Sequence, residues 1–263
     1  MIKKEICWNI TTRCNQSCRY CHRFLKIKDL SLKKNIKILN NLIYNGVTDI
    51  TWTGGEALLL NGIDKLLEIG YNNGIKNKLI TNGKLLNIDR IIKIGKYLDS
   101  IVLSIDSTDN LINEKLGRGF DHYNNVKEIL DYLKVNFKVK IRINSVVCSY
   151  TKNEYKKLIT FLNNYDIYSW RLFKFMPLRE TAVNNKDEFS ISLNEYNDII
   201  KNVRLKSKIE NIDSRVESDM EEKYILILAN GDIVITQDGI DKKVGNALSD
   251  KVCFSKINYY KKI

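Results

Sequence analysis

Three cysteines near the start of the chain, Cys14, Cys18 and Cys21, are spaced C-x3-C-x2-C. Three thiols on one short loop can each ligate one iron of a cubane [4Fe–4S] cluster, which normally takes four thiolates. The other three cysteines are scattered along the chain, so no fourth ligand lies nearby. One iron would then be open to a non-protein ligand, and we expect a cluster suited to chemistry rather than to structure.

A zinc site is the alternative use of the same thiols. Structural zinc takes four ligands, and His22 is the only near candidate for the fourth. Further along, Gly54, Gly55 and Glu56 follow an apolar run. Two glycines would let the backbone approach a ligand closely, and the Glu56 carboxylate could accept a hydrogen bond from an ammonium group. The spacing of the cysteines alone leaves both uses open.

The elements that position these residues follow from apolar periodicity. Short apolar runs alternate with amphipathic stretches of helical period, and each pair is long enough for a right-handed crossover between parallel strands. Six strands in series predict an α/β fold, a partial (βα)6 TIM-like barrel. We expect strands at 5–11, 47–53, 77–81, 100–105, 138–147 and 168–175, and helices near 31–45, 61–73, 86–97, 122–135 and 151–165.

The pattern changes after residue 176, where Pro177 interrupts the chain. We expect a loop over 178–190, a helix over 193–206, and a β-hairpin over 224–236 because Asn230-Gly231 favours a tight turn. The prediction is one barrel core over 1–176 and a short C-terminal α/β-hairpin extension over 177–263. We expect the extension to pack on the barrel rather than to form an independent domain.

Composition and charge narrow the classes of partner. The chain has 263 residues and a net charge of +12, from 43 Lys and Arg against 31 Asp and Glu. The basic residues are spread over the whole sequence without a dense block, which indicates compositional bias rather than specific nucleic-acid binding. There is no apolar run of about 18 residues and no charged leader, so we expect no membrane span and a cytoplasmic location.

Polar and small residues recur where the predicted strands end. Parallel β/α architectures gather their reactive groups at the carboxyl ends of the strands. A purely structural barrel would not require this pattern. The residues in question are Gly54, Gly55 and Glu56 after the second strand, Thr81, Asn82 and Gly83 at the end of the third, Ser104 and Asp106 after the fourth, Arg142 and Asn144 on the fifth, and Arg171 and Lys174 on the sixth.

Over about residues 5–176 the chain resembles the radical S-adenosylmethionine (SAM) enzymes. The cysteine spacing is the defining motif of that family, with Tyr20 just before the last cysteine, and Gly54-Gly55-Glu56 stands where the family places its SAM-amino-group motif. The family often has proline after this motif, whereas Ala57 follows here. The resemblance implies that SAM chelates the open iron and is cleaved reductively to a 5′-deoxyadenosyl radical. That radical abstracts hydrogen from a substrate, and an electron donor such as flavodoxin or ferredoxin is implied.

The resemblance also implies a set of site residues. The three cysteines would hold the cluster. The other residues match SAM-binding positions of the family: Tyr20 against the adenine, Glu56 at the amino group, Arg118 at the carboxylate, and Ser104 and Asn144 at the ribose or methionyl portion. His122 is expected to be a surface residue of its helix.

The tracts 140–147 and 170–178 resemble both viperins, which are radical SAM nucleotide dehydratases, and the molybdenum-cofactor cyclase, which acts on GTP. The cyclase holds a second cluster with a C-terminal cysteine trio, and only Cys253 occurs here. We therefore expect a lyase or oxidoreductase that acts on a small anionic, nucleotide-like substrate. Arg142, Arg171 and Lys174 would contact its phosphates.

Two other functions remain open. One is a single-cluster radical SAM enzyme that modifies a peptide or protein side chain. The other is a non-catalytic iron–sulfur module, which would have no need of the polar set at the strand ends. Asp49, where a viperin would have a basic phosphate contact, and the short C-terminal tail without the expected catalytic tyrosine are departures from the viperin pattern.

Overall fold

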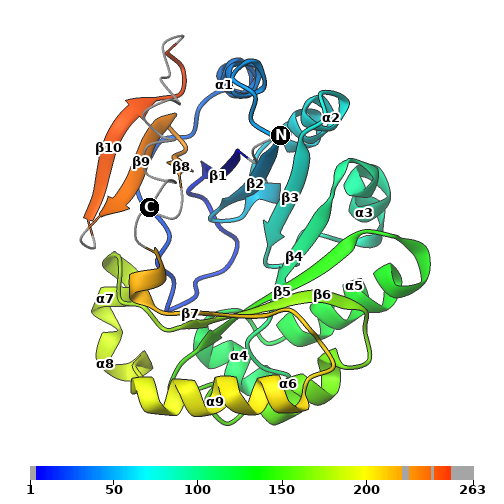
Figure 1. The fold of residues 1–263 in the computed structure, drawn as a ribbon, viewed down its shortest axis with the longest axis vertical. Coiled ribbons are helices and arrows are strands. Elements are labelled where there is room, and N and C mark those ends of the chain that lie inside the picture. Colours follow the sequence, from blue (N-terminus) through cyan, green and yellow to red (C-terminus); the bar gives the residue numbers. More distant parts are fainter. Residues whose placement is uncertain (1–3, 221–224, 238–239, 250–263) are drawn as a thin grey trace.

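The computed structural model describes residues 4–220, 225–237 and 240–249. Its strands form one curved sheet in the order β10-β9-β8-β1-β2-β3-β4-β5-β6-β7, with helices along the outer side (Figure 1). The first six strands are parallel and follow one another in space, which confirms the partial barrel. They are β1 (Glu5–Thr11), β2 (Asp49–Gly54), β3 (Lys76–Thr81), β4 (Ser100–Ser104), β5 (Lys140–Val147) and β6 (Ile167–Lys174).

The crossover helices lie close to the predicted ranges. Ser31 shows how the sequence starts one of them, because its side chain accepts a hydrogen bond from the backbone N–H of Lys34 and caps the first turn. The sequence missed the short helix α4 (Asn110–Leu116). The others are α1 (Leu32–Tyr44), α2 (Ile63–Asn72), α3 (Ile88–Ile94), α5 (His122–Asn136) and α6 (Tyr155–Leu162), with 3₁₀ turns η1 (Ala57–Leu59) and η2 (Gly95–Tyr97).

Side-chain alternation along β1 separates the core from the site. Ile6, Trp8 and Ile10 are buried in the main core, where Trp8 stacks on Trp52 of β2 with ring centroids 5.2 Å apart. The alternate residues, Cys7 and Asn9 among them, face the inside of the barrel and line a cavity. Each fully buried aliphatic side chain of the outer layer contributes about 1.5–3 kcal/mol relative to exposure. The inner face carries polar residues such as Asn9 together with apolar ones such as Ile80 and Phe173.

The C-terminal part extends both edges of the sheet. The predicted hairpin is confirmed by β8 (Leu226–Ile227) and β9 (Asp232–Gln237), although its predicted start at residue 224 lies outside the described residues. The sequence missed β10 (Ile240–Asn246), which pairs with β9, and β7 (Ile212–Arg215), which pairs in parallel with β6. The boundary between a barrel core and an extension at residue 176 stays a prediction.

The segment after Pro177 departs from the prediction. The loop expected over 178–190 contains two short helices, α7 (Glu180–Asn184) and α8 (Lys186–Phe189). They form because Ala182 and Phe189 are buried in a small cluster with Tyr20 of the cysteine loop. The predicted helix over 193–206 is confirmed as α9 (Leu193–Lys206), which begins with a capping box of Ser192 and Glu195.

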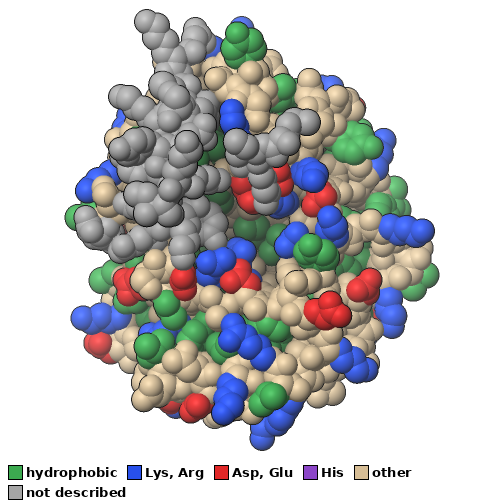
Figure 2. Space-filling view, in the orientation of Figure 1, with side chains coloured by type: hydrophobic (Ala, Val, Ile, Leu, Met, Phe, Trp, Pro, Cys, Tyr) green, Lys and Arg blue, Asp and Glu red, His purple; other side chains and the backbone are tan. Residues whose placement is uncertain are grey.

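Two surface properties follow from the whole molecule. On the face shown in Figure 2, Lys and Arg side chains are scattered between other residues rather than gathered into one dense patch. In the part of the chain that the structure describes, no helix is long and apolar enough to span a lipid bilayer.

Candidate active site

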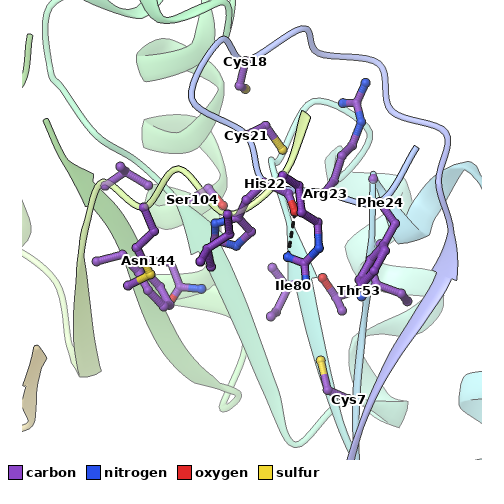
Figure 3. A pocket seen from close by; sticks show the side chains of 18 of the residues that line it. Cys7, Cys18, Cys21, His22, Arg23, Phe24, Thr53, Ile80, Ser104 and Asn144 are labelled. Atoms are coloured by element: carbon purple, nitrogen blue, oxygen red, sulfur yellow. Dashed lines mark hydrogen bonds between the residues drawn. The ribbon is translucent and has the colours of Figure 1, made fainter. Parts of the chain in front are cut away.

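A cavity of about 570 Å³ opens at the carboxyl ends of the strands and continues into the barrel. Figure 3 shows Cys18 and Cys21 at the top of this cavity and Cys7 at the bottom, with Ser104 and Asn144 on the neighbouring strands. The structure brings together twelve of the thirteen predicted site residues. Those that line the cavity are Cys14, Cys18, Tyr20, Cys21, Gly54, Gly55, Glu56, Ser104, Arg118, Asn144, Arg171 and Lys174.

The two glycines after β2 have a different neighbour from the one expected. A Cβ atom on Gly54 would lie 2.2 Å from the carbonyl oxygen of Thr11, and one on Gly55 would lie 2.1 Å from that of Arg13. The Gly55 N–H donates to the Thr11 carbonyl at 2.8 Å. The glycines therefore make room for the backbone that leads from β1 into the cysteine loop, whereas the sequence suggested close approach to a ligand.

The middle of the cysteine loop is held from the other side by Gly117. The Ser17 N–H donates to the Gly117 carbonyl at 3.1 Å, and the Arg19 N–H donates to the Leu116 carbonyl at 3.0 Å. A Cβ atom on Gly117 would lie 2.2 Å from the Ser17 carbonyl oxygen, and its φ of +80° also favours glycine. The end of α4 thus fixes the backbone between Cys14 and Cys18.

Glu56 is fixed by three donors from its own chain. One carboxylate oxygen accepts from the Leu58 N–H at 3.1 Å and the Thr81 hydroxyl at 2.9 Å, and the other accepts from the Asn82 N–H at 2.8 Å. Burial raises the pKa of this carboxyl, and the backbone N–H groups partly offset the effect. The oxygen that bonds to Asn82 keeps a second lone pair that another donor could use.

Asp106 joins four segments of the site and is fully buried. One carboxylate oxygen accepts from the Tyr20 hydroxyl and from Arg118 Nε, both at 2.5 Å, and the other accepts from the Val146 N–H at 2.7 Å. Burial alone would lower the pKa of the Arg118 guanidinium, but the Asp106 carboxylate raises it well above its ordinary value. The hydroxyl of Tyr20 is therefore engaged by Asp106, which leaves its backbone for the hydrogen bonds predicted beside the adenine.

Gln16, inside the cysteine loop, connects this ion pair to His122. The Gln16 side-chain amide donates from Nε2 to His122 Nδ1 at 3.3 Å, and its Oε1 accepts from Arg118 at 3.3 Å. His122 Nε2 donates to the Ser104 carbonyl at 2.9 Å. His122 is buried at the start of α5, so the expectation of a surface residue was wrong. Burial and the nearby Arg118 lower its pKa to about 3, which keeps the ring neutral.

Asn82, which follows β3, was noted from the sequence only as a strand-end residue and was assigned no role. Its side-chain amide lies 3.8 Å from the Cys14 sulfur and donates to Asn15 Oδ1 at 2.8 Å. Among the described residues, the buried donors Asn15 Nδ2 and Arg23 Nε have no hydrogen-bond partner. The only sequence signal for these positions was their place at a strand end or in the cysteine loop.

Basic side chains of β6 and of the segment that follows it, Arg171, Lys174 and Arg179, line the cavity and form what we call its basic wall. Arg171 pairs with Asp213 at 2.6 Å, and Arg179 pairs with Asp241 at 2.9 Å. In the part of the chain that the structure describes, Lys174 pairs with no carboxylate. The charge of this wall is therefore partly balanced by acids behind it and partly available to a ligand.

Arg142 is the predicted site residue that the structure does not bring into the cavity. Its guanidinium lies 4.5 Å from the ring centroid of Tyr168 and donates to the Ser169 hydroxyl at 3.2 Å. Arg142 and Asn144 share the inner face of β5, but Arg142 lies nearer the amino end of the strand. Alternation along a strand predicts which face a side chain lies on, but not its depth in the barrel. The prediction that Arg142 contacts the substrate directly is therefore corrected.

A family model described as the radical SAM superfamily matches residues 8–162. The chain belongs to the radical SAM superfamily. It is therefore an enzyme, and its family implies SAM and an iron–sulfur cluster.

Relatives of known activity are similar to this radical SAM protein over most of its length. One from Flammeovirga pacifica is 28% identical over 243 residues, which cover 86% of this chain and 80% of the relative. Another from Selenomonas ruminantium is 26% identical and covers 92% of this chain and 89% of the relative. Both are named S-adenosylmethionine-dependent nucleotide dehydratase.

A solved structure of similar fold is Streptococcus suis SuiB bound to its precursor peptide SuiA. The TM-score is 0.78 at 19% identity, with 96% of this chain and 64% of the SuiB chain covered. At this level of identity the similarity concerns the fold alone. It supports the arrangement of a parallel barrel with further strands at its edge.

The residues present fit an iron–sulfur cluster at the cysteine loop of this radical SAM protein. In the described ranges no three or more His, Cys, Asp or Glu side chains gather closely enough to hold a single metal ion, as zinc would require. A cubane instead attaches each thiolate to a different iron. The unpartnered donors of Asn15 and Arg23 beside the thiols could bond to sulfur acceptors. Desolvation raises the pKa of the Cys18 thiol to about 12 without a metal, and coordination would remove that proton.

Proposed function

We propose that this protein is a radical SAM enzyme that abstracts a hydrogen atom from a small nucleotide-like substrate, in the manner of the nucleotide dehydratases. The observation that carries the proposal is that one cavity is lined both by the three cysteines and by the basic wall. Its lining contains six Lys or Arg residues and two carboxylates, Glu5 and Glu56. Asp106, Asp213 and Asp241 behind the lining pair with four of these six basic residues. A phosphate-bearing ligand would therefore bond to Lys174 and to the terminal N–H groups of Arg171.

Cys14, Cys18 and Cys21 would hold a [4Fe–4S] cluster at the mouth of the cavity. When bound, the cluster and SAM supply reductive cleavage of SAM and a hydrogen-abstracting 5′-deoxyadenosyl radical. The backbone contacts of Thr11, Arg13 and Ser17 hold the loop in a fixed position. Because those contacts come from the end of β2 and the end of α4, the loop needs little reorganisation when it binds its cofactors.

Each of the predicted SAM-binding residues would contact a different group of SAM. Glu56 has one acceptor site that no donor of the described residues uses, and this site could receive the SAM ammonium. Arg118 remains cationic because of Asp106 and could pair with the SAM carboxylate. Ser104 and Asn144 lie side by side, as register partners of β4 and β5, where they could bond to the ribose or methionyl portion.

The substrate would occupy the part of the cavity between β1 and the late strands. Arg171 and Lys174 of β6 would contact its phosphates. The volume and charge of the cavity support a small anionic substrate over a peptide segment, and the likeness to SuiB is one of fold only. The electron would come from a small redox protein such as flavodoxin or ferredoxin.

The experiment is to reconstitute the protein anaerobically and measure 5′-deoxyadenosine with dithionite, SAM and a panel of nucleoside mono-, di- and triphosphates. At least one nucleotide should raise the rate above the rate without substrate. If no phosphorylated compound does so, while a peptide does, the nucleotide proposal is wrong and the peptide-modifying alternative takes its place.

A further inference from the structure

Two arginines of the cavity wall share one carboxylate. Asp213 on β7 accepts from Arg171 Nε at 2.6 Å and from Arg215 Nη2 at 3.0 Å, and its second oxygen lies 3.0 Å from Arg215 Nε. Both arginines line the cavity. The carboxylate of Asp213 therefore binds two guanidinium groups of the cavity wall, and we call the set Arg171–Asp213–Arg215 the triad.

The triad lies in the same row of the sheet as the predicted SAM contacts. Arg171 is the register partner of Asn144 on one side and of Asp213 on the other. Asn144 in turn pairs with Ser104. Adjacent strands are about 4.8 Å apart, so Arg171 lies one strand away from Asn144. A ligand that spans this row would contact SAM at one end and the triad at the other.

The backbone behind the triad is held rigidly. The buried hydroxyl of Tyr196 on α9 donates to the Leu172 carbonyl at 2.8 Å and accepts from the Arg215 N–H at 2.9 Å. It thereby joins β6 to β7 at the level of the triad. Arg204 of the same helix donates to the Ser214 hydroxyl at 3.1 Å. The short strand β7 is therefore fixed by α9 and not only by its pairing with β6.

We propose that the triad is an anion clamp for the phosphoryl groups of the substrate, and that Asp213 is its positioning residue. The inference rests on the proposed nucleotide substrate. Arg171 uses Nε for Asp213, and within the described residues its two terminal nitrogens have no hydrogen-bond partner. A guanidinium held by one edge presents its remaining N–H groups in a fixed plane, which suits a phosphate. Fixing that plane before binding reduces the ordering cost on association.

A positioning role for Asp213 and a simple counter-charge role predict opposite effects of Asp213→Asn on anion affinity. If Asp213 only neutralised the arginines, Asp213→Asn would make the wall more positive and strengthen anion binding. If it positions them, the same substitution weakens anion binding although the net charge of the wall rises. The change from Asp to Asn keeps the size of the side chain, so the two outcomes separate cleanly.

The test is anaerobic calorimetry on the reconstituted holoenzyme with SAM, using nucleoside triphosphates and inorganic tripolyphosphate as probes. We expect Asp213→Asn to weaken the binding of both by about tenfold. Asp131→Asn serves as the matched control, because it removes an exposed carboxylate that pairs with Lys127 away from the cavity. It should bind both probes like the wild type. Equal or tighter binding by Asp213→Asn would overturn the clamp.

A second variant, Arg171→Lys, tests the clamp independently in case Asp213→Asn does not fold. Arg171→Lys keeps the charge and loses the planar fork, so the binding of both probes should fall by a similar factor. Unchanged binding would contradict the clamp. If the wild type binds tripolyphosphate but no nucleotide, and Asp213→Asn weakens the tripolyphosphate binding, the clamp stands and the proposed function is wrong. If the wild type turns over a nucleotide and the Asp213→Asn variant binds both probes as tightly as the wild type, the proposed function stands and the clamp is wrong.

Discussion

At the scale of single residues, Asp106 and Gln16 determine how the site is ordered. Asp106 receives three donors from three segments, and Gln16 passes that order on to His122. The Ser104 carbonyl can only accept, so His122 Nε2 carries the proton and Nδ1 is left to accept from Gln16. This fixes the Gln16 amide with its oxygen toward Arg118. The predicted SAM contacts at Ser104 and Arg118 are therefore parts of one buried network.

The neutral state of His122 predicts a pH dependence of stability. The folded protein holds its pKa at about 3, whereas the ordinary value is 6.5. Between these values the unfolded chain binds a proton that the folded protein does not, so the free energy of unfolding rises with pH. The contribution of the neutral His122 to stability is lost progressively as the pH falls below 6.5. Urea unfolding should show wild type losing up to about 1.4 kcal/mol per pH unit relative to His122→Gln. Parallel pH profiles for the two proteins would refute this.

Cys18 and Cys148 provide a matched pair of thiols. Cys148 is buried and Cys18 is partly buried, and both pack in the small cluster around Tyr20 and Phe189, but only Cys18 lines the cavity. Cys18→Ala should lose most of its bound iron and SAM cleavage, because only two thiolates remain for the cluster. Cys148→Ala should retain both properties. Iron analysis and the electron paramagnetic resonance signal on adding SAM measure the difference, and full iron content in Cys18→Ala would contradict the assignment.

At the scale of elements, the cysteine loop is a segment held between β2 and the end of α4. Gly117→Ala should lower both iron content and thermal stability, because its Cβ would lie 2.2 Å from the Ser17 carbonyl oxygen. Gly74→Ala is the control. It has a similar φ of +76° but no atom within 4 Å of the new Cβ, so it should cost only backbone strain of about 1 kcal/mol. Equal iron content in the two variants would show that the contact does not hold the loop.

The sequence predicted the elements whose signals are local. The six parallel strands alternate with helices of clear period, and the cysteines lie on one short loop, so both could be read without tertiary knowledge. The strand β7 could not, because Ile212–Arg215 is four residues long, carries two charges and becomes a strand only by pairing with β6. The partners of Gly54, Gly117 and Arg171 depend on register and on chain crossings, which no local pattern encodes.

At the scale of the whole molecule, the curved sheet sets the depth of each side chain. Lys174 and Arg142 were both expected to contact substrate, but only Lys174 reaches the cavity. Lys174→Ala should weaken nucleotide binding by about ten- to a hundredfold, since a hydrogen bond to a charged group is worth roughly 1.5–3 kcal/mol. Arg142→Ala should leave it unchanged. Anaerobic binding measurements on the two variants check this, and an equal loss in both would mean that the cavity is not the substrate site.

The central claim is that one cavity joins the cysteine loop to the basic wall, so that the radical formed at one end reaches a nucleotide held at the other. The direct measurement uses a nucleoside triphosphate deuterated on the ribose, incubated with the reconstituted enzyme, SAM and reductant, followed by mass spectrometry of 5′-deoxyadenosine. We predict that deuterium moves from the nucleotide into 5′-deoxyadenosine. Turnover that leaves 5′-deoxyadenosine free of deuterium from every ribose position would contradict the claim.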